Sequence, residues 1–206
     1  SDDADPSWTQ DQIERFRAVA EAVQRGAGRR LVIHCANSGA VLAHESAWMD
    51  LVRPGIMIYG VRPSPETPAT IPLRPAMALR TRVSFVKRVA AGTSIGYGRT
   101  WFAPVDTHIA TISVGYADGF NRLFSNRGRV LIRGASHPVV GRVCMDQTMV
   151  DLGPTTDVQV GDEVVLMGRD GDQEISCEEW AAVLGTIPYE VTCQINPRVP
   201  RIHVPL

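Results

Sequence analysis

Leu51-Val52-Arg53-Pro54-Gly55-Ile56-Met57-Ile58-Tyr59-Gly60 places one apolar run on each side of an arginine, a proline and a glycine. Bounded apolar runs of this length favour buried parallel strands over a helix. A charge at the mouth of a buried strand is costly without a partner. Arg53 therefore offers a fixed cation, and the amides of Gly55 and Ile56 are free to meet an anion. The alternative is a strand-loop-strand in which the arginine only forms a salt bridge.

The residues before this stretch alternate between helical and strand patterns. Thr9–Gly26 has an amphipathic stripe, and Thr9 with Gln12 forms a capping box. Leu31–Ile33 reads as a short buried strand, and Ala40–Met49 as a second helix. The order helix, strand, helix, strand is the pattern of βα units around a parallel sheet.

Asn37-Ser38-Gly39 lies where the first of these strands ends and a helix begins. A helix N-terminus exposes unpaired amides and the positive end of the helix dipole, which suits a phosphate. Ser38 adds a hydroxyl donor. The alternative is a plain N-cap without a ligand.

A proline-rich connector, Val61–Pro75, marks a change in composition, and we place the domain boundary within it. Residues 1–72 form the βα part and residues 73–206 a mostly antiparallel β domain. One helix interrupts that domain, where Ser176 and Glu179 form a capping box. The expected strands, separated by turns rich in glycine or aspartate, are Met77–Val89, His108–Val114, Arg129–Ile132, His137–Cys144, Met149–Leu152 and Glu163–Met167.

Three turns of the β domain carry more reactive side chains than a turn requires: Gly96–Arg99, Ser113–Gly119 and Gly141–Asp146. Two of them hold a tyrosine beside glycine, and the third ends in a cation, a thioether and a carboxylate. Each alone is explained by a tight turn with satisfied polar groups. Three together in one small domain favour a functional role, since loops carry function more often than cores.

Composition excludes several classes of function. The net charge is −1, so no bulk electrostatic attraction to nucleic acid or anionic membrane is expected, and no apolar run reaches transmembrane length. The 4 cysteines and 5 histidines lack metal-ligand spacing, which predicts no metal site. Scattered cysteines without a disulfide framework favour a reduced, cytoplasmic protein.

The first residues, Ser1 to Pro6, form an acidic segment that does not resemble a signal peptide and does not start with methionine. This segment leads directly into a helix, so we expect the chain to begin inside a larger protein.

Six motifs follow one another along the chain: His34-Cys35-Ala36-Asn37-Ser38, Arg53 to Gly60, Ile95 to Arg99, Val114 to Gly119, Gly141 to Gln147 and Asn196 to Arg201. Taken together, these motifs resemble those of the alanine racemase family. The resemblance implies the C-terminal part of a (β/α)8 barrel followed by an antiparallel β domain, that is, α/β plus β. It also implies a pyridoxal-phosphate enzyme, a cytoplasmic homodimer that interconverts L- and D-alanine and supplies D-alanine for peptidoglycan.

The resemblance assigns cofactor-binding roles. Arg53 would hydrogen-bond the pyridine nitrogen, which then has to stay an unprotonated acceptor, because arginine only donates. The phosphate would be held by Ser38, by the amides of Gly55 and Ile56, and by the phenol of Tyr189.

The resemblance also assigns substrate-handling roles. Tyr97 would exchange the α-proton on one face of the substrate, acting in the partner subunit. The backbone amide of Met145 would bind the substrate carboxylate across the same interface. Tyr116, with Tyr189, would narrow the approach to small amino acids. Residues expected along the access corridor or around the ligand are His34, Arg122, Arg142 and Asp146.

The lysine that holds the cofactor covalently in this family has no counterpart here, since the only lysine, Lys87, lies in a predicted strand outside the family motif. We therefore expect a piece of the enzyme that is inactive alone. Three alternatives stay open: a fold-related decarboxylase of basic amino acids, a broad-specificity or serine racemase, and a non-catalytic module for dimerisation or binding.

Overall fold

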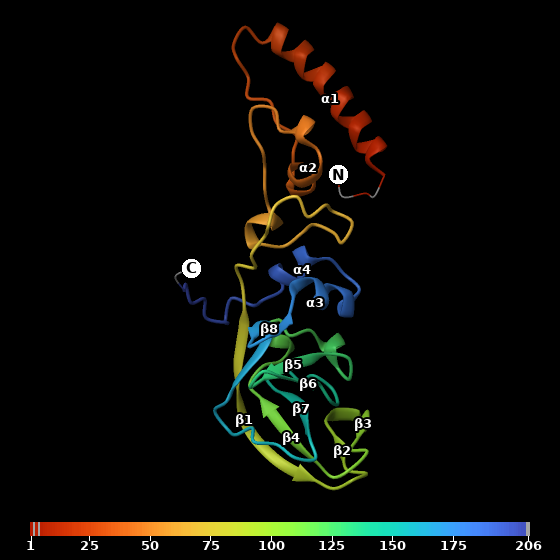
Figure 1. Ribbon diagram of the computed structural model, residues 1–206, viewed down its shortest axis with the longest axis vertical. Helices are drawn as coiled ribbons and strands as arrows, with labels where there is room; N and C mark the ends of the chain where they lie inside the picture. The colour runs from red at the N-terminus through yellow and green to blue at the C-terminus, as the bar shows by residue number, and fades with distance from the viewer. Residues whose placement is uncertain (2, 4, 205–206) are drawn as a thin grey trace. The chain divides into compact units, whose positions relative to one another are not determined.

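The computed structural model describes residues 1, 3 and 5–204. The chain forms two compact units, Ser1–Ala76 (unit 1) and Met77–Leu206 (unit 2) (Figure 1). The boundary predicted from sequence, between residues 72 and 73, lies in the same part of the chain. None of the helices in the described residues combines the length and apolar character needed to cross a bilayer.

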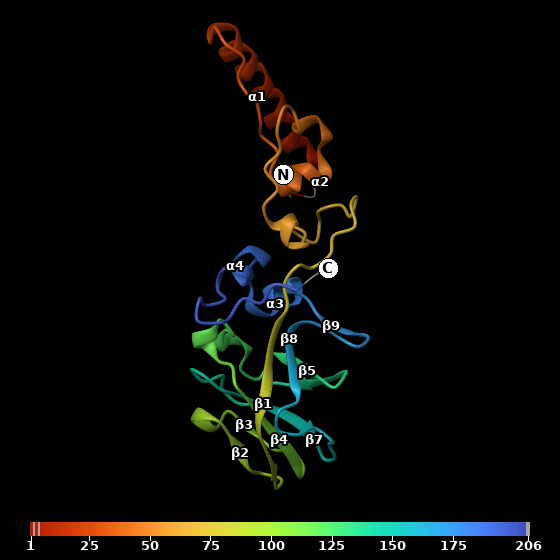
Figure 2. The same cartoon turned by 90° about the vertical axis from the view of Figure 1, so that its left-hand side faces the viewer.

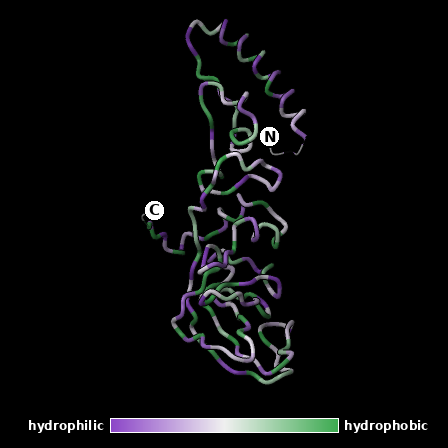
Figure 3. The backbone as a smooth tube through the Cα atoms, in the orientation of Figure 1, coloured by the Kyte–Doolittle hydropathy of each residue, from purple (hydrophilic) through white to green (hydrophobic). Residues whose placement is uncertain are grey.

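Unit 1 begins with the long helix α1, Pro6–Gly26. Its N-cap is Asp5, whose carboxylate accepts from the amide of Ser7, and not the predicted Thr9, which lies buried inside the helix. Proline at the first helical position explains the earlier start, because its missing N–H needs no partner there. Hydrophilic and hydrophobic residues are interspersed along α1 (Figure 3).

The predicted second helix of unit 1 is shorter than expected. Helix α2 spans Ser38–Ala43, and Asn37 caps it by accepting from the amide of Ala40 at 3.0 Å. The helix stops at His44, whose φ of −137° and ψ of 81° are not helical, and the 3-10 turn η1 follows at Glu45–Ala47. A small cluster of buried side chains joins these elements to α1: Ile13, Ala36, Ala40 and Ala47.

The two strands predicted in unit 1 are wrong as strands. Residues 31–37 and 51–55 belong to no sheet, and the second apolar run forms a 3-10 turn, η2, at Ile56–Tyr59. The two segments are nevertheless joined by backbone hydrogen bonds from Asp50 to Ile33 (3.1 Å) and from Arg53 to Ala36 (2.8 Å). So few bonds do not make a β ladder, although they hold the two segments next to each other.

Unit 2 is built on one antiparallel sheet in the order β6-β5-β8-β1-β4-β7, with β9 paired to β8, and a separate two-stranded hairpin, β2-β3 (Figure 2). Every pairing in both sheets is antiparallel. The strands are β1 Leu79–Val89, β2 Ser94–Ile95, β3 Trp101–Phe102, β4 Thr107–Ile112, β5 Arg129–Ile132, β6 Ala135–Pro138, β7 Thr148–Gly153, β8 Glu163–Asp170 and β9 Gln173–Ile175.

The β strands predicted for unit 2 are found, with two differences. The predicted strand His137–Cys144 ends at Pro138, after which only a bridge from Val139 to Val150 continues the pairing. The chain then turns away at Gly141, whose φ is 73°. The short strands β2, β3 and β9 were not predicted, because runs of two or three residues carry no readable alternation.

Two helices cover part of unit 2: α3, Cys177–Leu184, and α4, Pro188–Cys193. The predicted capping box of α3 is formed in part. Ser176 Oγ accepts from the amide of Glu179 at 3.1 Å, whereas the Glu179 carboxylate accepts from Arg129. Trp180 is 2% exposed, and its indole nitrogen donates to the carbonyl of Leu166 at 2.9 Å. Helix α3 is thereby fixed to β8.

Candidate active site

Unit 2 holds an open hollow of about 590 Å³. Apart from Val143, Cys144 and Gln147, every residue that lines it was predicted as a site residue. The predicted residues that the structure brings together here are Tyr97, Tyr116, Arg122, Arg142, Met145 and Asp146. Each of them stands in a short 3-10 turn or a loop and none in a strand, as expected for functional side chains carried by a rigid sheet.

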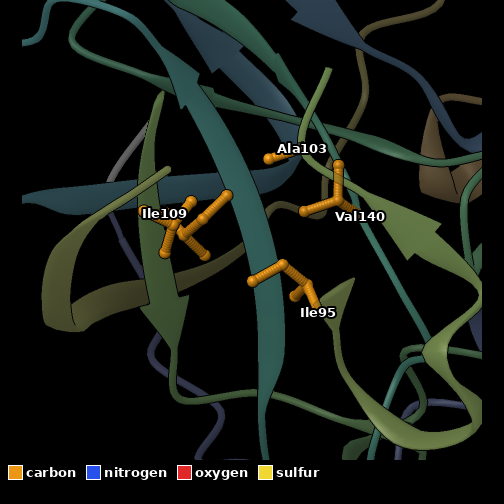
Figure 4. Close-up of a cluster of buried hydrophobic side chains, with 5 residues drawn as sticks. Ile95, Ala103, Ile109 and Val140 are labelled. Carbon is orange, nitrogen blue, oxygen red and sulfur yellow. The ribbon is translucent and has the colours of Figure 1, made fainter. Parts of the chain in front are cut away.

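Tyr97 stands at the tip of the β2-β3 hairpin, in the segment Gly96–Thr100, which we name the Tyr97 loop. Gly96 and Gly98 have φ of 75° and 72°, a conformation that glycine adopts without strain. The phenol side chain is 76% exposed. The hairpin supports it through a buried cluster of Val89, Ile95, Ala103, Ile109 and Val140, shown in Figure 4.

The segment Gly141–Gln147, named the Met145 loop, closes on itself through a hydrogen bond from the amide of Cys144 to the carbonyl of Gln147 at 2.9 Å. The Met145 carbonyl accepts from the amide of Ala117 at 3.0 Å. Among the described residues, the Met145 amide has no partner, so it remains available to an acceptor such as a carboxylate.

Gly115 lies directly under the Met145 loop. A Cβ added there would come 2.2 Å from the carbonyl oxygen of Cys144 and 2.3 Å from that of Met145. Its φ of −154° is ordinary extended backbone, so the need for glycine is purely steric. The close approach lets Tyr116 donate its amide to the Cys144 carbonyl at 3.0 Å, which fixes Tyr116 beside the loop.

Arg198 braces two of these loops and was not assigned a role from the sequence. Its Nε donates to Asp118 at 2.8 Å and its Nη2 to Asp146 at 2.5 Å. The other oxygen of Asp118 accepts from the amide of Gly115 at 2.9 Å. Hydrogen bonds to Asp118 and then to Asp146 raise the pKa of Arg198. Its position between two prolines in the Asn196–Arg201 motif was the signal that could have identified it.

The guanidinium groups of Arg122 and Arg142 form no hydrogen bond or ion pair with another described residue. Asp146 faces the same hollow, but its charge is shared with Arg198. The hollow therefore presents two uncommitted cations and one free amide, a donor set that suits a carboxylate.

A second group of predicted residues lies within unit 1. Arg53 donates to Nδ1 of His34 at 2.5 Å and to the carbonyl of Cys35 at 3.4 Å. Because arginine cannot accept, the His34 Nδ1 has to be unprotonated in this contact. Burial raises the pKa of the Cys35 thiol, and the charge of Arg53 partly offsets this effect.

Ser38 is the centre of the rest of this group and is 2% exposed. Its Oγ accepts from the amides of Gly55 at 2.8 Å and Met57 at 3.4 Å, so its own proton is left to donate. The amide of Ile56 has no partner among the described residues. The Gly55 amide, expected to be free, is instead engaged with Ser38. A hydroxyl and an amide that converge without acceptors fit a phosphate oxygen.

Tyr189, the remaining predicted residue, stands in the first turn of α4 in unit 2 and is 37% exposed. Pro188 starts the helix, and the Tyr189 carbonyl accepts from Thr192 Oγ1 at 2.9 Å.

Comparison with known proteins identifies both units. The family described as alanine racemase, C-terminal domain, matches residues 76–203, and alanine racemase, N-terminal domain, matches residues 1–63. An alanine racemase of Chlorobaculum tepidum is 50% identical over 202 residues, which are 98% of this chain and 52% of that protein.

Solved structures agree with this match. An alanine racemase from Bacillus anthracis with bound L-Ala-P has a TM-score of 0.92 at 37% identity, covering 99% of this chain and 53% of that one. One from Bartonella henselae with covalently bound pyridoxal phosphate has a TM-score of 0.86 at 31% identity, covering 98% and 54%.

The chain spans about half the length of the curated relatives it matches. These likenesses, with the antiparallel sheet of unit 2, confirm the predicted fold class and the predicted resemblance. The chain belongs to the alanine racemase family.

Proposed function

We propose that this chain supplies one face of the active site of an enzyme that interconverts L- and D-alanine. The observation that carries the proposal is the gathering of Tyr97, the free Met145 amide and two uncommitted arginines around one hollow, in a chain of this family. Racemisation needs a proton removed on one face of the α-carbon and returned on the other. A tyrosine can take up that proton as the phenolate and return it as the phenol.

Pyridoxal phosphate is the proposed cofactor, because the donors of unit 1 fit it. When bound, it supplies a conjugated ring that accepts the electron pair left at the α-carbon. Arg53, held by His34, would donate to the ring nitrogen. The Ser38 hydroxyl and the Ile56 amide would donate to the phosphate, and Tyr189 is the other family-assigned donor, whereas the Gly55 amide would support Ser38 instead. A likeness to a Bartonella henselae structure with covalently bound pyridoxal phosphate supports this choice.

Substrate handling is proposed for the hollow of unit 2. The Met145 amide would bind the alanine carboxylate, and Tyr116, with Tyr189, would exclude larger side chains. Arg122, Arg142 and Asp146 would line the approach.

We also propose a homodimer. Tyr97 is 76% and Met145 54% exposed, which is unusual for residues that act on a sequestered substrate. A partner subunit that receives both loops would cover them. Free cysteines in the described residues are consistent with a cytoplasmic setting, and the product D-alanine would serve peptidoglycan synthesis.

The 206-residue chain alone is proposed to be inactive. Its one lysine, Lys87, lies exposed in β1 and does not belong to the family motif for covalent cofactor attachment. The test is therefore a chimera, in which the part of the Chlorobaculum tepidum relative that this chain does not cover is joined to residues 1–206.

The chimera should racemise alanine in the presence of pyridoxal phosphate, whereas residues 1–206 alone should not. Tyr97→Phe should slow exchange of the α-hydrogen with solvent about 10²- to 10⁴-fold for one enantiomer and much less for the other. Tyr59→Phe is the matched control, since Tyr59 is the only tyrosine outside the proposed site. Equal losses for both enantiomers would contradict a one-face role.

Two other outcomes would favour one of the alternative functions. Turnover of serine at a rate close to that of alanine would indicate a broad-specificity racemase. A dimeric chimera that binds neither cofactor nor alanine would support the non-catalytic module instead.

A further inference from the structure

One side chain outside the hollow contacts both of the loops that line it. Asn126 Oδ1 accepts from the amide of Gly141, the first residue of the Met145 loop, at 2.6 Å. Its Nδ2 donates to Oγ1 of Thr100 at 3.1 Å and to the Thr100 carbonyl at 3.4 Å. Thr100 is the last residue of the Tyr97 loop, so a single amide group spans the two loops.

The turn that carries Asn126 is itself fixed to the core. The amides of Arg127 and Gly128 both donate to the carbonyl of Phe124, at 3.0 and 2.8 Å. The Phe124 ring stacks on Phe120 with centroids 4.6 Å apart and meets Trp180 at 4.7 Å. Asn126 has a left-handed φ of 57°, a conformation that asparagine tolerates better than most residues. The turn therefore offers a rigid reference point for both loops.

The neighbouring residue contacts only one of the loops. Ser125 Oγ accepts from the amide of Val143 in the Met145 loop at 3.0 Å and donates to the Arg122 carbonyl at 2.6 Å. Substitutions at Ser125 and Thr100 can therefore test the two loops one at a time. Ser125 contacts the Met145 loop, and Thr100 belongs to the Tyr97 loop.

We propose that Asn126 is a positioning residue, which fixes the phenol of Tyr97 relative to the amide of Met145. The inference rests on the proposed function, in which these two groups address the same α-carbon and carboxylate. Both line the same hollow, and both stand on loops with exposed tips. A shift of about 1 Å between them would cost on the order of 10²-fold in rate, since catalysis depends on the attack geometry.

The experiment compares three variants of the chimera by kinetics and three variants of residues 1–206 by hydrogen exchange. Asn126→Gly keeps the left-handed backbone and removes both contacts. It should raise the KM for alanine about tenfold and slow α-hydrogen exchange unequally for the two enantiomers, by about 10- to 100-fold for the one served by Tyr97. Thr100→Val should change only the ratio of the α-hydrogen exchange rates of the two enantiomers. Ser125→Ala should change only the KM for alanine.

Hydrogen exchange gives a readout that does not need activity. Amides of both loops should exchange faster in Asn126→Gly, and those of one loop in each single-contact variant. If the parent chimera is inactive, the proposed function fails, while the exchange pattern still decides whether Asn126 joins the loops. A variant Asn126→Gly that only melts at lower temperature, with KM, enantiomer ratio and loop exchange unchanged, would overturn the positioning role.

Discussion

Units 1 and 2 bury their apolar residues to very different extents. In unit 2, both faces of the sheet carry side chains that are fully excluded from solvent, among them Ile109, Ile112 and Leu131, each 0% exposed. In unit 1, several large apolar side chains face solvent in this chain, including Val32 at 64% and Ile58 at 67% exposure. A sheet that closes its own core fixes its loops, whereas extended segments without a ladder depend on further contacts.

The two groups of proposed site residues are therefore preorganised to different degrees. The Met145 loop is held by its close approach to Gly115 and by the Arg198 brace, and the Tyr97 loop stands on the β2-β3 hairpin above a buried cluster. Arg53 and Ser38 are fixed by a few local hydrogen bonds within unit 1. Unit 2 is therefore expected to set the geometry of substrate handling without help from unit 1.

Amide hydrogen exchange of residues 1–206 tests this difference most strongly. Amides in β1, β4 and β8 should exchange at least about a thousandfold more slowly than those in residues 31–37 and 51–55, because global opening is needed to expose a central strand. Mass spectrometry of peptic peptides after a time course measures both. Similar rates in the two units would remove the contrast.

A charge reversal in unit 1 should change the chemistry of the chimera rather than its fold. Arg53→Glu places an acceptor where a guanidinium donates, so a bound pyridine nitrogen would keep its proton. We expect racemisation to fall about 10²-fold and a transamination product to appear, followed by absorbance and product chromatography. Arg29→Glu, an exposed loop change in the same unit, is the control. An unchanged spectrum and product profile would count against the contact.

The same change, glycine to alanine, should have different effects on the stability of the two units. Gly115→Ala forces a methyl group against two carbonyl oxygens and should destabilise unit 2 by about 2–4 kcal/mol, with a weaker binding of alanine by the chimera. Gly26→Ala has nothing within 4 Å of the added carbon and should be neutral or slightly stabilising. Urea unfolding followed by circular dichroism compares them, and equal effects would contradict the steric argument.

Alkylation should separate Cys35 of unit 1 from Cys177 of unit 2 by about tenfold or more in rate. Burial, followed by the charge of Glu178, raises the pKa of Cys177 from 9.0 to about 12, so the reactive thiolate is scarce at pH 8. Cys35 in unit 1 is only partly buried and should be alkylated sooner. Timed alkylation and peptide mapping give the order, and faster labelling of Cys177 would refute it.

The same thiol makes unit 2 sensitive to alkali. Because the pKa is higher in the folded state, the neutral thiol stabilises the fold fully below pH 9, and this stabilisation declines as the pH rises toward 12. Cys177→Ala should flatten that part of the stability profile in a series of thermal melts. A profile unchanged by the substitution would argue that another group dominates.

The sequence predicted unit 2 better than unit 1 for a physical reason. Antiparallel strands such as β5 and β8 alternate or form apolar runs between glycine turns, so local pattern suffices to place them. The segments 31–33 and 51–58 carried a strand pattern too, but a parallel strand exists only when distant neighbours complete its ladder.

The hollow was predicted through motifs, whereas its supports were missed. Tyr97, Met145 and the arginines stand in short motifs that could be read directly. Arg198 and Asn126 act on residues far away in the chain, with separations of 80 and 52 for Arg198 and of 26 and 15 for Asn126. No local periodicity reports such contacts.

The bare backbone at Gly115 has a consequence for how this family can diversify. A side chain at that position is blocked by two carbonyl oxygens, whereas Tyr116 beside it lines the open hollow. Selection for new amino-acid substrates can therefore change the side chains that line the hollow one at a time, while position 115, packed against the Met145 loop, accepts only glycine. Natural variants with altered substrate range should carry their changes among these lining side chains.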